Sequence, residues 1–494
     1  MLLWFVILYL MISVGIGLWA ATRVHSAKDF AVAGRSLPLP VVTATVFATW
    51  FGAEAVFGIP ATFVQDGLGG VVADPFGSSM CLILAGIFFS TKLYKLNIIT
   101  LGDFYRMRYN RTVEVITTIC IVLSYLGWVA AQIKALGLIF NVVTDGYISQ
   151  DAGMILGAAI VLTYTTFGGM FSVAFLDFVQ MMVSMGGLLF IGWTVSGMTG
   201  GVAPVLEHAS QAGKLEFFPK SGDPWLWITF LGTWMTMMLG SIPQQDVFQR
   251  ITSAKSAKIA ITGSILGASI YFCFTFVPMF IAYAATMLEP DKFAKIIAAD
   301  SQLVLPTLVL QSMPLFAQVL FFGAVLSAIM SCSSATLLAP SVTFAENVVK
   351  GFYPHMSDHT FLKVMRGCLV GFALMVLTFA LNSDSSIFEM VESAYKVTLA
   401  GAFVPLVFGA FWKRATTQGA LMATIGGLLS WILVEVLIGE EHSLIPPQLI
   451  GLCISAVGIV VGSLLPQWVG HRHPQPPGFL HEHAAHGHSQ HQKL

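Results

Sequence analysis

The residues with the clearest capacity for chemistry are polar groups set inside long apolar segments. Glu54 follows the apolar run Phe47–Ala53 and precedes Gly58-Ile59-Pro60. Glycine and proline in mid-segment indicate a helix that opens, and backbone carbonyl groups freed at such a break can bind a cation. A carboxylate in an apolar environment is costly unless it has a use. The pattern therefore favours a binding site over a simple kink in which Glu54 pairs with a neighbouring helix.

A second polar cluster consists of four serines within eight residues, from Ser327 to Ser334. A single serine in a helix can bond to the carbonyl group one turn earlier, but four exceed that need. Hydroxyl and carbonyl oxygens suit a hard, weakly charged cation such as Na⁺, whereas imidazole or several thiolates would suit a transition metal. The cluster is therefore a candidate Na⁺ site, with back-bonding within the helix as the alternative.

Two lysines also lie within apolar segments. Lys396 is four residues after Glu392, a spacing typical of an ion pair on one helix. Lys134 has no acidic residue within one helical turn. Its partner must therefore come from another helix, from a bound solute, or from the membrane interface by snorkelling.

The elements that carry these residues belong to a membrane protein. Of the 494 residues, 56% are hydrophobic and only 10% are charged, and the mean hydropathy is +0.80. A soluble domain has about 25% charged residues, so most of this surface cannot face water. The formal net charge of −1 argues against a nucleic-acid binder that uses bulk basic charge. The six cysteines lie in apolar runs at wide spacing, typical of packing residues rather than of disulfides or a metal site.

Runs of the length that a bilayer requires, about 20 residues, recur along the chain. The alternating polarity of a membrane β-barrel is absent, so we predict an all-α polytopic protein with thirteen transmembrane helices. The predicted spans are 1–22, 39–64, 70–92, 114–141, 152–167, 173–198, 225–242, 258–287, 315–345, 362–382, 387–411, 417–438 and 446–465. The seventh is broken at Gly240–Pro243, as the second is near Glu54. Two breaks five helices apart indicate an inverted repeat of five-helix halves.

Basic residues in the connections give the orientation. Most of the 24 lysines and arginines fall in one set of alternate loops, and the opposite set holds only Lys214, Lys220, Lys292 and Lys295. By the positive-inside rule, the N-terminus is outside and the C-terminus is cytoplasmic. We expect a multi-pass protein of the plasma membrane, which is the inner membrane in a bacterium. Two external connections, about 199–224 and 288–313, are long enough to hold short surface helices.

After residue 465 the chain becomes polar and rich in proline and histidine, which predicts a disordered cytoplasmic tail over 466–494. Clustered imidazoles can capture a metal ion, but these have no fixed spacing and no cysteine partner, so a solvated tail is favoured. The histidines considered for this weak metal site are His481, His483, His486 and His488.

Enzyme motifs are missing from the chain. The phosphate-binding pattern GxxxxGK[ST], the zinc pattern HExxH and the nucleophile pattern GxSxG do not occur. We therefore expect no enzymatic activity and no organic cofactor.

Three stretches resemble the sodium/solute symporter family, whose members have the inverted-repeat fold of the LeuT class. Residues 168–180, which include Gly168-Gly169, Asp177 and Gln180, resemble the signature at the entry to the fifth core helix. Ser331-Cys332-Ser333-Ser334 resembles the serine-rich sodium segment of the eighth, and residues 408–420, which begin with Phe408-Gly409-Ala410, resemble the segment after the tenth.

The resemblance implies a leading helix at 1–26, a ten-helix transport core at 27–416 and two appended helices at 417–465. It implies a main sodium site made of backbone oxygens and side chains of the second and ninth spans. These residues are Ala48, Phe51, Ala328, Ser331 and Cys332. Family members usually have Ser or Thr at the last position, and a thiol is a poor ligand for Na⁺.

A second sodium ion in some relatives would here lie between Asp177 and the serine segment, at Ser331 and Ser334. Ala335 and Leu176 stand where hydroxyl residues would help, so we expect one sodium ion, with a second as the alternative. Asp177 could instead be a gating or structural carboxylate.

The resemblance also implies a solute pocket beside the first break. Its expected lining is Trp50, Gly52, Glu54, Gln132, Lys134 and Trp234. Glu54 and Lys134, facing each other across the pocket, could pair with an ammonium and a carboxylate group. The sequence thus predicts a small zwitterion or organic acid, such as an amino acid.

The expected function is Na⁺-coupled uptake of this solute by alternating access, with the solute, Na⁺ and the lipid bilayer as partners. A transporter-like sensor, a proton-coupled symporter of the same fold and a passive channel are the alternatives. The sequence does not give the oligomeric state, and a monomer is compatible with it.

Overall fold

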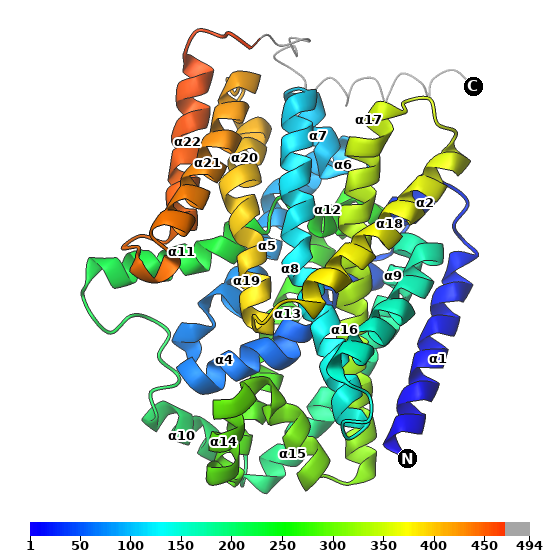
Figure 1. Cartoon of the computed structure of the whole chain (residues 1–494), viewed down its shortest axis with the longest axis vertical. Coiled ribbons are helices and arrows are strands. Elements are labelled where there is room, and N and C mark those ends of the chain that lie inside the picture. The colour runs from blue at the N-terminus through cyan, green and yellow to red at the C-terminus, as the bar shows by residue number, and fades with distance from the viewer. Residues whose placement is uncertain (470–494) are drawn as a thin grey trace.

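The computed structural model describes residues 1–469, and within that range it is built of helices with no β-strand (Figure 1). Helices are expected because backbone polar groups in a hydrocarbon layer must be satisfied within the segment itself. The segments that make up the long helical spans are α1 (Leu2–Ala21), α3 (Leu39–Trp50), η2 (Glu54–Gly58), α4 (Ile59–Asp66), η4 (Val72–Gly77), α5 (Ser78–Leu84), η5 (Ala85–Phe89), α6 (Ser90–Lys95), α8 (Arg111–Val143), α9 (Gln150–Met198), α11 (Pro224–Gly240), α12 (Gln245–Ser253), α13 (Ala257–Leu288), α16 (Leu315–Phe344), η7 (Ala345–Val349), α18 (Asp358–Leu381), α19 (Ile387–Thr398), η8 (Leu399–Phe403), α20 (Val404–Phe411), α21 (Thr417–Leu437) and α22 (Pro447–Leu464). Short helices outside these are α2 (Ala27–Val32), α7 (Leu101–Arg108), α10 (Val202–Gln211), α14 (Pro290–Asp300), α15 (Val304–Ser312) and α17 (Lys350–Phe352).

Among the described residues, 11 helices are long and apolar enough to cross a membrane, and up to 13 are when each bent pair is joined into one span. The predicted all-α polytopic architecture is confirmed. The predicted histidine-rich tail, 466–494, lies mostly outside the described residues.

Helix α9 accounts for two of the predicted spans, 152–167 and 173–198. Its 49 residues would measure about 74 Å as a straight helix, more than twice the hydrocarbon thickness. The helix is broken at Gly169, where φ is 49° and ψ is −140°. A Cβ atom there would lie 2.5 Å from the carbonyl oxygen of Phe30, so only glycine permits this close approach at positive φ. The break separates the two halves where the sequence predicts a connection.

Two further spans are opened at the predicted positions. Helix α3 and the segment formed by η2 and α4 meet at a bend of 59°, and α11 and α12 meet at 44°. The first break leaves Phe51 and Gly52 outside regular helix, directly before Glu54. Backbone groups at such breaks are free to bind a ligand when protein surrounds them.

The short helices α10, α14 and α15 lie at the end of the molecule where α1 begins, and α22 finishes at the opposite end (Figure 1). These three helices form in the two connections that the sequence marks as long enough to hold them. The stretch Pro290–Ser312 passes the length and apolarity test for a span, but its helices lie at this end, beside α10.

The predicted ion pair between Lys396 and Glu392 is wrong. The Lys396 ammonium group lies 2.5 Å from a carboxylate oxygen of Glu440, which comes from the connection between α21 and α22. Lys396 is only 6% exposed, so the appended helix pair supplies the counter-charge for a lysine buried in the core.

Candidate functional site

A carboxylate and two hydroxyl groups meet where α3, α9 and α16 pack together. The hydroxyl group of Thr45 and that of Ser331 each donate a short hydrogen bond to the Asp177 carboxylate. The Ser331 hydroxyl oxygen also lies 3.3 Å from the carbonyl oxygen of Ala48, on α3 just before the break. All three side chains are buried. Oxygen atoms from three separate helices thus converge at one point, and oxygen ligands of this kind suit a hard cation such as Na⁺.

The other serines of the cluster act differently. Ser333 donates to the carbonyl oxygen of Ile329 at 2.6 Å, and Ser334 donates to that of Ser331 at 2.9 Å. Both are the back-bonds that any serine in a helix can form. Ser331 is therefore the serine that reaches Asp177, and the structure does not bring Ser334 to that carboxylate by a hydrogen bond.

At the break itself the chain packs so closely that only glycine fits. A Cβ atom on Gly52 would lie 2.6 Å from both the Cβ atom of Cys332 and a side-chain oxygen of Gln132. Cys332 and Ala328 are buried on α16, and the Cys332 side chain lies against Gly52. Gly52 therefore lies between Cys332, the neighbour of Ser331 on α16, and Gln132, which holds Glu54.

Glu54 is 1% exposed and is held by side chains of α8. The Gln132 amide nitrogen donates to one carboxylate oxygen at 2.6 Å, and the Trp128 indole nitrogen donates to the other at 3.2 Å. The Gln132 amide oxygen accepts from the backbone N–H of Ala53 at 2.8 Å. Gln132 therefore ties the broken span to α8 at both the carboxylate and the backbone.

Three aromatic rings, one of them the Trp128 ring that bonds to Glu54, pack against one another beside the break. The ring centroids of Trp50 and Trp128 are 5.2 Å apart, those of Trp128 and Tyr395 are 5.6 Å apart, and those of Trp50 and Tyr395 are 5.9 Å apart. Each ring is less than 2% exposed. The Tyr125 ring stacks on that of Trp128, with ring centroids 5.8 Å apart. We call Trp50, Trp128 and Tyr395 the aromatic cluster. It brings together the first break, α8 and α19.

Sequence reasoning placed Trp50 in the site but missed Trp128, Tyr395 and Thr45. A signal for Trp128 was present, because it lies four residues before Gln132 and so shares its face of the helix. Tyr395 comes from a distant span, and nothing local in the sequence links it to Trp50.

Lys134 does not face Glu54. Its ammonium group donates to the carbonyl oxygens of Ser383 and Ser385, at 3.3 and 2.7 Å, in the connection that leads into α19. Lys134 is two residues after Gln132, which on a helix places the two side chains on nearly opposite faces. It lines a separate polar cavity of about 250 Å³ together with Asp300 and Asp384.

Trp234 also lies away from the aromatic cluster. Its ring packs against Phe217 and Phe230, with centroids 5.9 and 5.7 Å apart, and its backbone oxygen lies close to Gly77. In residues 1–469 no group of three or more histidine, cysteine, aspartate or glutamate side chains is arranged to hold a metal ion. The histidines His481, His483, His486 and His488 lie outside the described residues.

The sodium:solute symporter family model matches residues 30–427, which is most of the chain and includes both breaks and the serine segment. The chain belongs to the sodium:solute symporter family. Its membership confirms the family resemblance seen in the sequence.

Two relatives of known name can be aligned with most of this chain. The human high affinity choline transporter 1 is 26% identical over 465 residues, covering 90% of this chain and 77% of the relative. The sodium/pantothenate symporter of Escherichia coli (strain K12) is 26% identical over 473 residues, covering 93% and 96%.

Among solved structures, a Na⁺-coupled sialic acid symporter in a substrate-bound outward-open state matches with a TM-score of 0.80 and 19% identity, covering 94% of this chain and 97% of that one. This match shows the LeuT-like fold. The protein is thus a multi-pass helical member of a family that couples Na⁺ to the transport of a solute.

Proposed function

We propose that this family member is a symporter that uses Na⁺ to drive uptake of a small organic cation carrying a methylated ammonium group, such as choline. The observation that supports this solute class is the aromatic cluster lying directly beside the buried Glu54 carboxylate. A quaternary ammonium group cannot donate a hydrogen bond. Aromatic faces together with one compensating anion are the surfaces that bind it best.

The positions of Glu54 and Lys134 favour a cation over the amino acid or organic acid expected from the sequence. That expectation depended on Lys134 offering its charge to a solute carboxylate across from Glu54. In the structure Lys134 instead binds two backbone carbonyl groups outside the cluster. Glu54 is then a buried acidic group bonded to a ring of the cluster, and a buried anion that faces an incoming solute disfavours an anionic one.

The relatives differ in the solutes that their names give. The choline transporter and the pantothenate symporter are both 26% identical to this chain, so identity alone does not separate their solutes. The site chemistry carries the proposal.

In the proposed cycle, Na⁺ enters between Ala48, Phe51, Ala328 and Ser331 and ties α3 to α16. Asp177 and Thr45 orient the Ser331 hydroxyl group through their hydrogen bonds. The solute then parts the three rings and pairs with Glu54, and the bundle rocks to open the site inward. Because the two sites touch through Gly52, each ligand should raise the affinity for the other by the same factor.

The test is uptake of radiolabelled choline into vesicles that contain the purified protein. An inward Na⁺ gradient should drive accumulation, an equal K⁺ gradient should not, and unlabelled glycine betaine or alanine should compete poorly. Glu54→Gln should reduce choline uptake at least about 100-fold, since it removes the charge partner of a desolvated cation. Glu207→Gln, an exposed carboxylate on α10, is the matched control and should leave uptake within about twofold.

Other outcomes would redirect the proposal. Accumulation of alanine but not of choline would overturn the solute class. Uptake driven equally well by a proton gradient would favour proton coupling, and Na⁺-dependent binding without any uptake would favour a sensor.

A further inference from the structure

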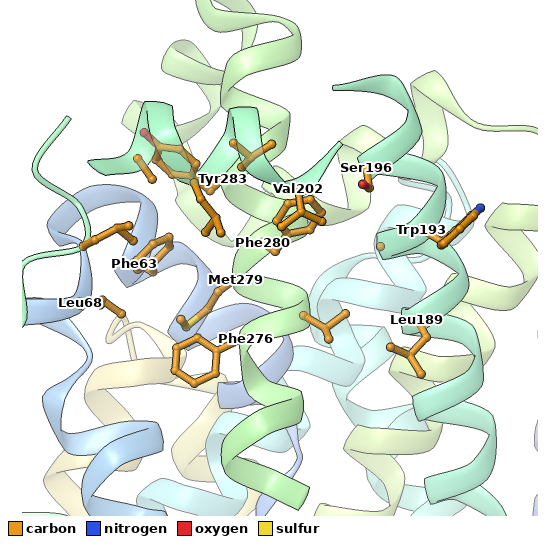
Figure 2. Close-up of a pocket in the computed structure, with 16 residues that line it drawn as sticks. Phe63, Leu68, Leu189, Trp193, Ser196, Val202, Phe276, Met279, Phe280 and Tyr283 are labelled. Atoms are coloured by element: carbon orange, nitrogen blue, oxygen red, sulfur yellow. The ribbon is translucent and has the colours of Figure 1, made fainter. Parts of the chain in front are cut away.

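A large apolar cavity lies outside the site described above, between the second half of α9, α10 and α13 (Figure 2). Its volume is about 590 Å³. The wall is almost entirely aliphatic and aromatic, and Figure 2 shows Phe63, Leu189, Phe276 and Phe280 among its side chains, with Trp193 at the outer edge. Neither the ion site nor the aromatic cluster contributes a residue to it.

The cavity opens sideways onto the surface that faces the bilayer. Leu189 and Trp193 stand at its edge on α9 and are 50% and 82% exposed, and Met182, about two turns earlier on that helix, is 62% exposed. Such a run of exposed apolar side chains on a transmembrane helix is its lipid-facing side. The mouth of the cavity is therefore continuous with the lipid surface.

Helix α10 covers the cavity toward the aqueous end of the molecule. Val205 and Ala209 line the cavity and are buried, whereas Glu207 and Gln211 on the other side of this helix are exposed. An apolar cavity does not hold water stably, because its wall offers no hydrogen-bond partners.

We infer that this cavity binds an acyl chain of a bilayer phospholipid. Lipid tails are the apolar groups present at high concentration at the mouth. A tail that enters the cavity leaves hydrocarbon rather than water, so it loses no favourable polar contact. The occupant enters tail first, with its headgroup left near the polar rim. That rim includes Ser196 and the hydrogen bond between the His208 ring and the Tyr283 hydroxyl group, 2.8 Å long.

Such a chain would touch parts of the protein that transport must move. Phe63 belongs to α4, the outer half of the broken span that carries Glu54, and Phe280 belongs to α13. Trp193 belongs to α9, the helix of Asp177. A ligand shifts a conformational equilibrium only as far as its affinity differs between the states. A lipid chain wedged between α9 and α13 would favour the state in which this cavity is open.

The test uses the full-length protein in vesicles of phosphatidylethanolamine and phosphatidylglycerol that contain a trace of phosphatidylethanolamine with a photoreactive diazirine at the end of one acyl chain. After illumination, mass spectrometry maps the labelled residues. Labelling should concentrate on 189–196 and 276–283 and exceed that of the exposed face of α1. Gly192→Phe should reduce labelling at these residues about tenfold, equal to about 1.4 kcal/mol of binding free energy.

The chain offers a matched control for this substitution. A Cβ atom on Gly192 would lie 3.4 Å from Val277 and 4.0 Å from Ile281, both ordinary contacts, so the phenylalanine side chain can extend into the cavity. Gly186, on the same helix, has nothing within 4 Å and is exposed, so Gly186→Phe adds the same side chain outside it. Ala209→Leu fills the cavity from α10 and serves if Gly192→Phe does not fold. Equal labelling of the filled and control variants, or labelling no denser than on α1, would overturn the proposal.

Discussion

At the scale of single residues, the site depends on how Glu54 is held. Its carboxylate has two donors, Gln132 and Trp128, and both come from one face of α8. The same two residues serve a second purpose, because Gln132 also accepts from the backbone at the break and Trp128 belongs to the aromatic cluster. One helix face therefore fixes the anion, the break and part of the ring wall together.

Replacing Gln132 tests this arrangement. Gln132→Leu keeps the side-chain size but leaves one oxygen of Glu54 and the Ala53 N–H without partners in a buried place. Each unsatisfied group costs about 1–3 kcal/mol, so choline affinity should fall by about tenfold or more. Equilibrium binding of labelled choline at saturating Na⁺ measures it. Gln132→Glu would place a second carboxylate beside Glu54 and should be more damaging still. An unchanged affinity in Gln132→Leu would mean that Glu54 does not contact the solute.

Cys332 gives a second residue-scale prediction, concerning the ion. A hydroxyl group in place of the thiol adds a hard oxygen near Ala328 and Ser331, the proposed Na⁺ ligands, so Cys332→Ser should raise the apparent Na⁺ affinity by about three- to tenfold, equal to about 0.7–1.4 kcal/mol. The Na⁺ dependence of choline uptake at fixed choline measures the change. Cys120→Ser, a buried cysteine on α8 outside the site, should leave the Na⁺ dependence unchanged. A loss of Na⁺ affinity in Cys332→Ser would show that packing against Gly52 is the important role of this side chain.

At the scale of elements, Lys134 links α8 to the start of α19. Its two hydrogen bonds fix the 383–385 connection, and α19 carries Tyr395 of the aromatic cluster further along. Phe388 at the start of the same helix packs against Gly58, one turn beyond Glu54. The position of α19 beside the broken span is therefore set at its N-terminal end by contacts with Lys134 and Gly58.

Lys134→Ala should consequently loosen the aromatic cluster from a distance. We expect choline affinity to fall about three- to tenfold while Na⁺ affinity stays the same, because hydrogen bonds from a charged donor contribute about 1.5–3 kcal/mol and this side chain is partly exposed. Lys134→Arg keeps the donors and should restore most of the affinity. Comparison with glycine betaine separates two roles: a direct contact with a solute carboxylate would make the loss much larger for betaine than for choline.

The positions of most helices could be predicted from the sequence, because the bilayer sets the length and apolar composition of each span. The breaks were predictable too, since Gly52, Gly240 and Pro243 interrupt otherwise continuous runs. The partners of Lys396 and Lys134 were not. Lys396 pairs with a residue 44 positions away, Glu440, and Lys134 faces the opposite side from Gln132. The aromatic cluster joins three spans, and only their packing shows that its rings meet.

At the scale of the whole molecule, the broken second span links the two sites that symport must couple. Ala48 lies by the Ser331 hydroxyl group on one side of the break, and Glu54 lies among the rings on the other. The neighbours of this span include α9, α13 and α16, which come from both halves of the proposed ten-helix core, 27–416. Any movement that separates α3 from α16 would therefore disturb the ion and the solute together.

The direction of transport depends on which end of the molecule faces the cytoplasm, and this can be measured. Helix α1 begins and α22 finishes at opposite ends, as an odd number of crossings requires (Figure 1). Lys220 is exposed in the connection after α10, at the end with few basic residues, and Lys413 is exposed in the connection before α21. By the positive-inside rule Lys220 is external and Lys413 is cytoplasmic. In intact cells, a membrane-impermeant maleimide should label Lys220→Cys at once and Lys413→Cys only after permeabilisation, with the unsubstituted protein as the background. The reverse pattern would place the Pro290–Ser312 helices inside the cell, and an inward Na⁺ gradient would then meet this protein from the end that carries its basic loops.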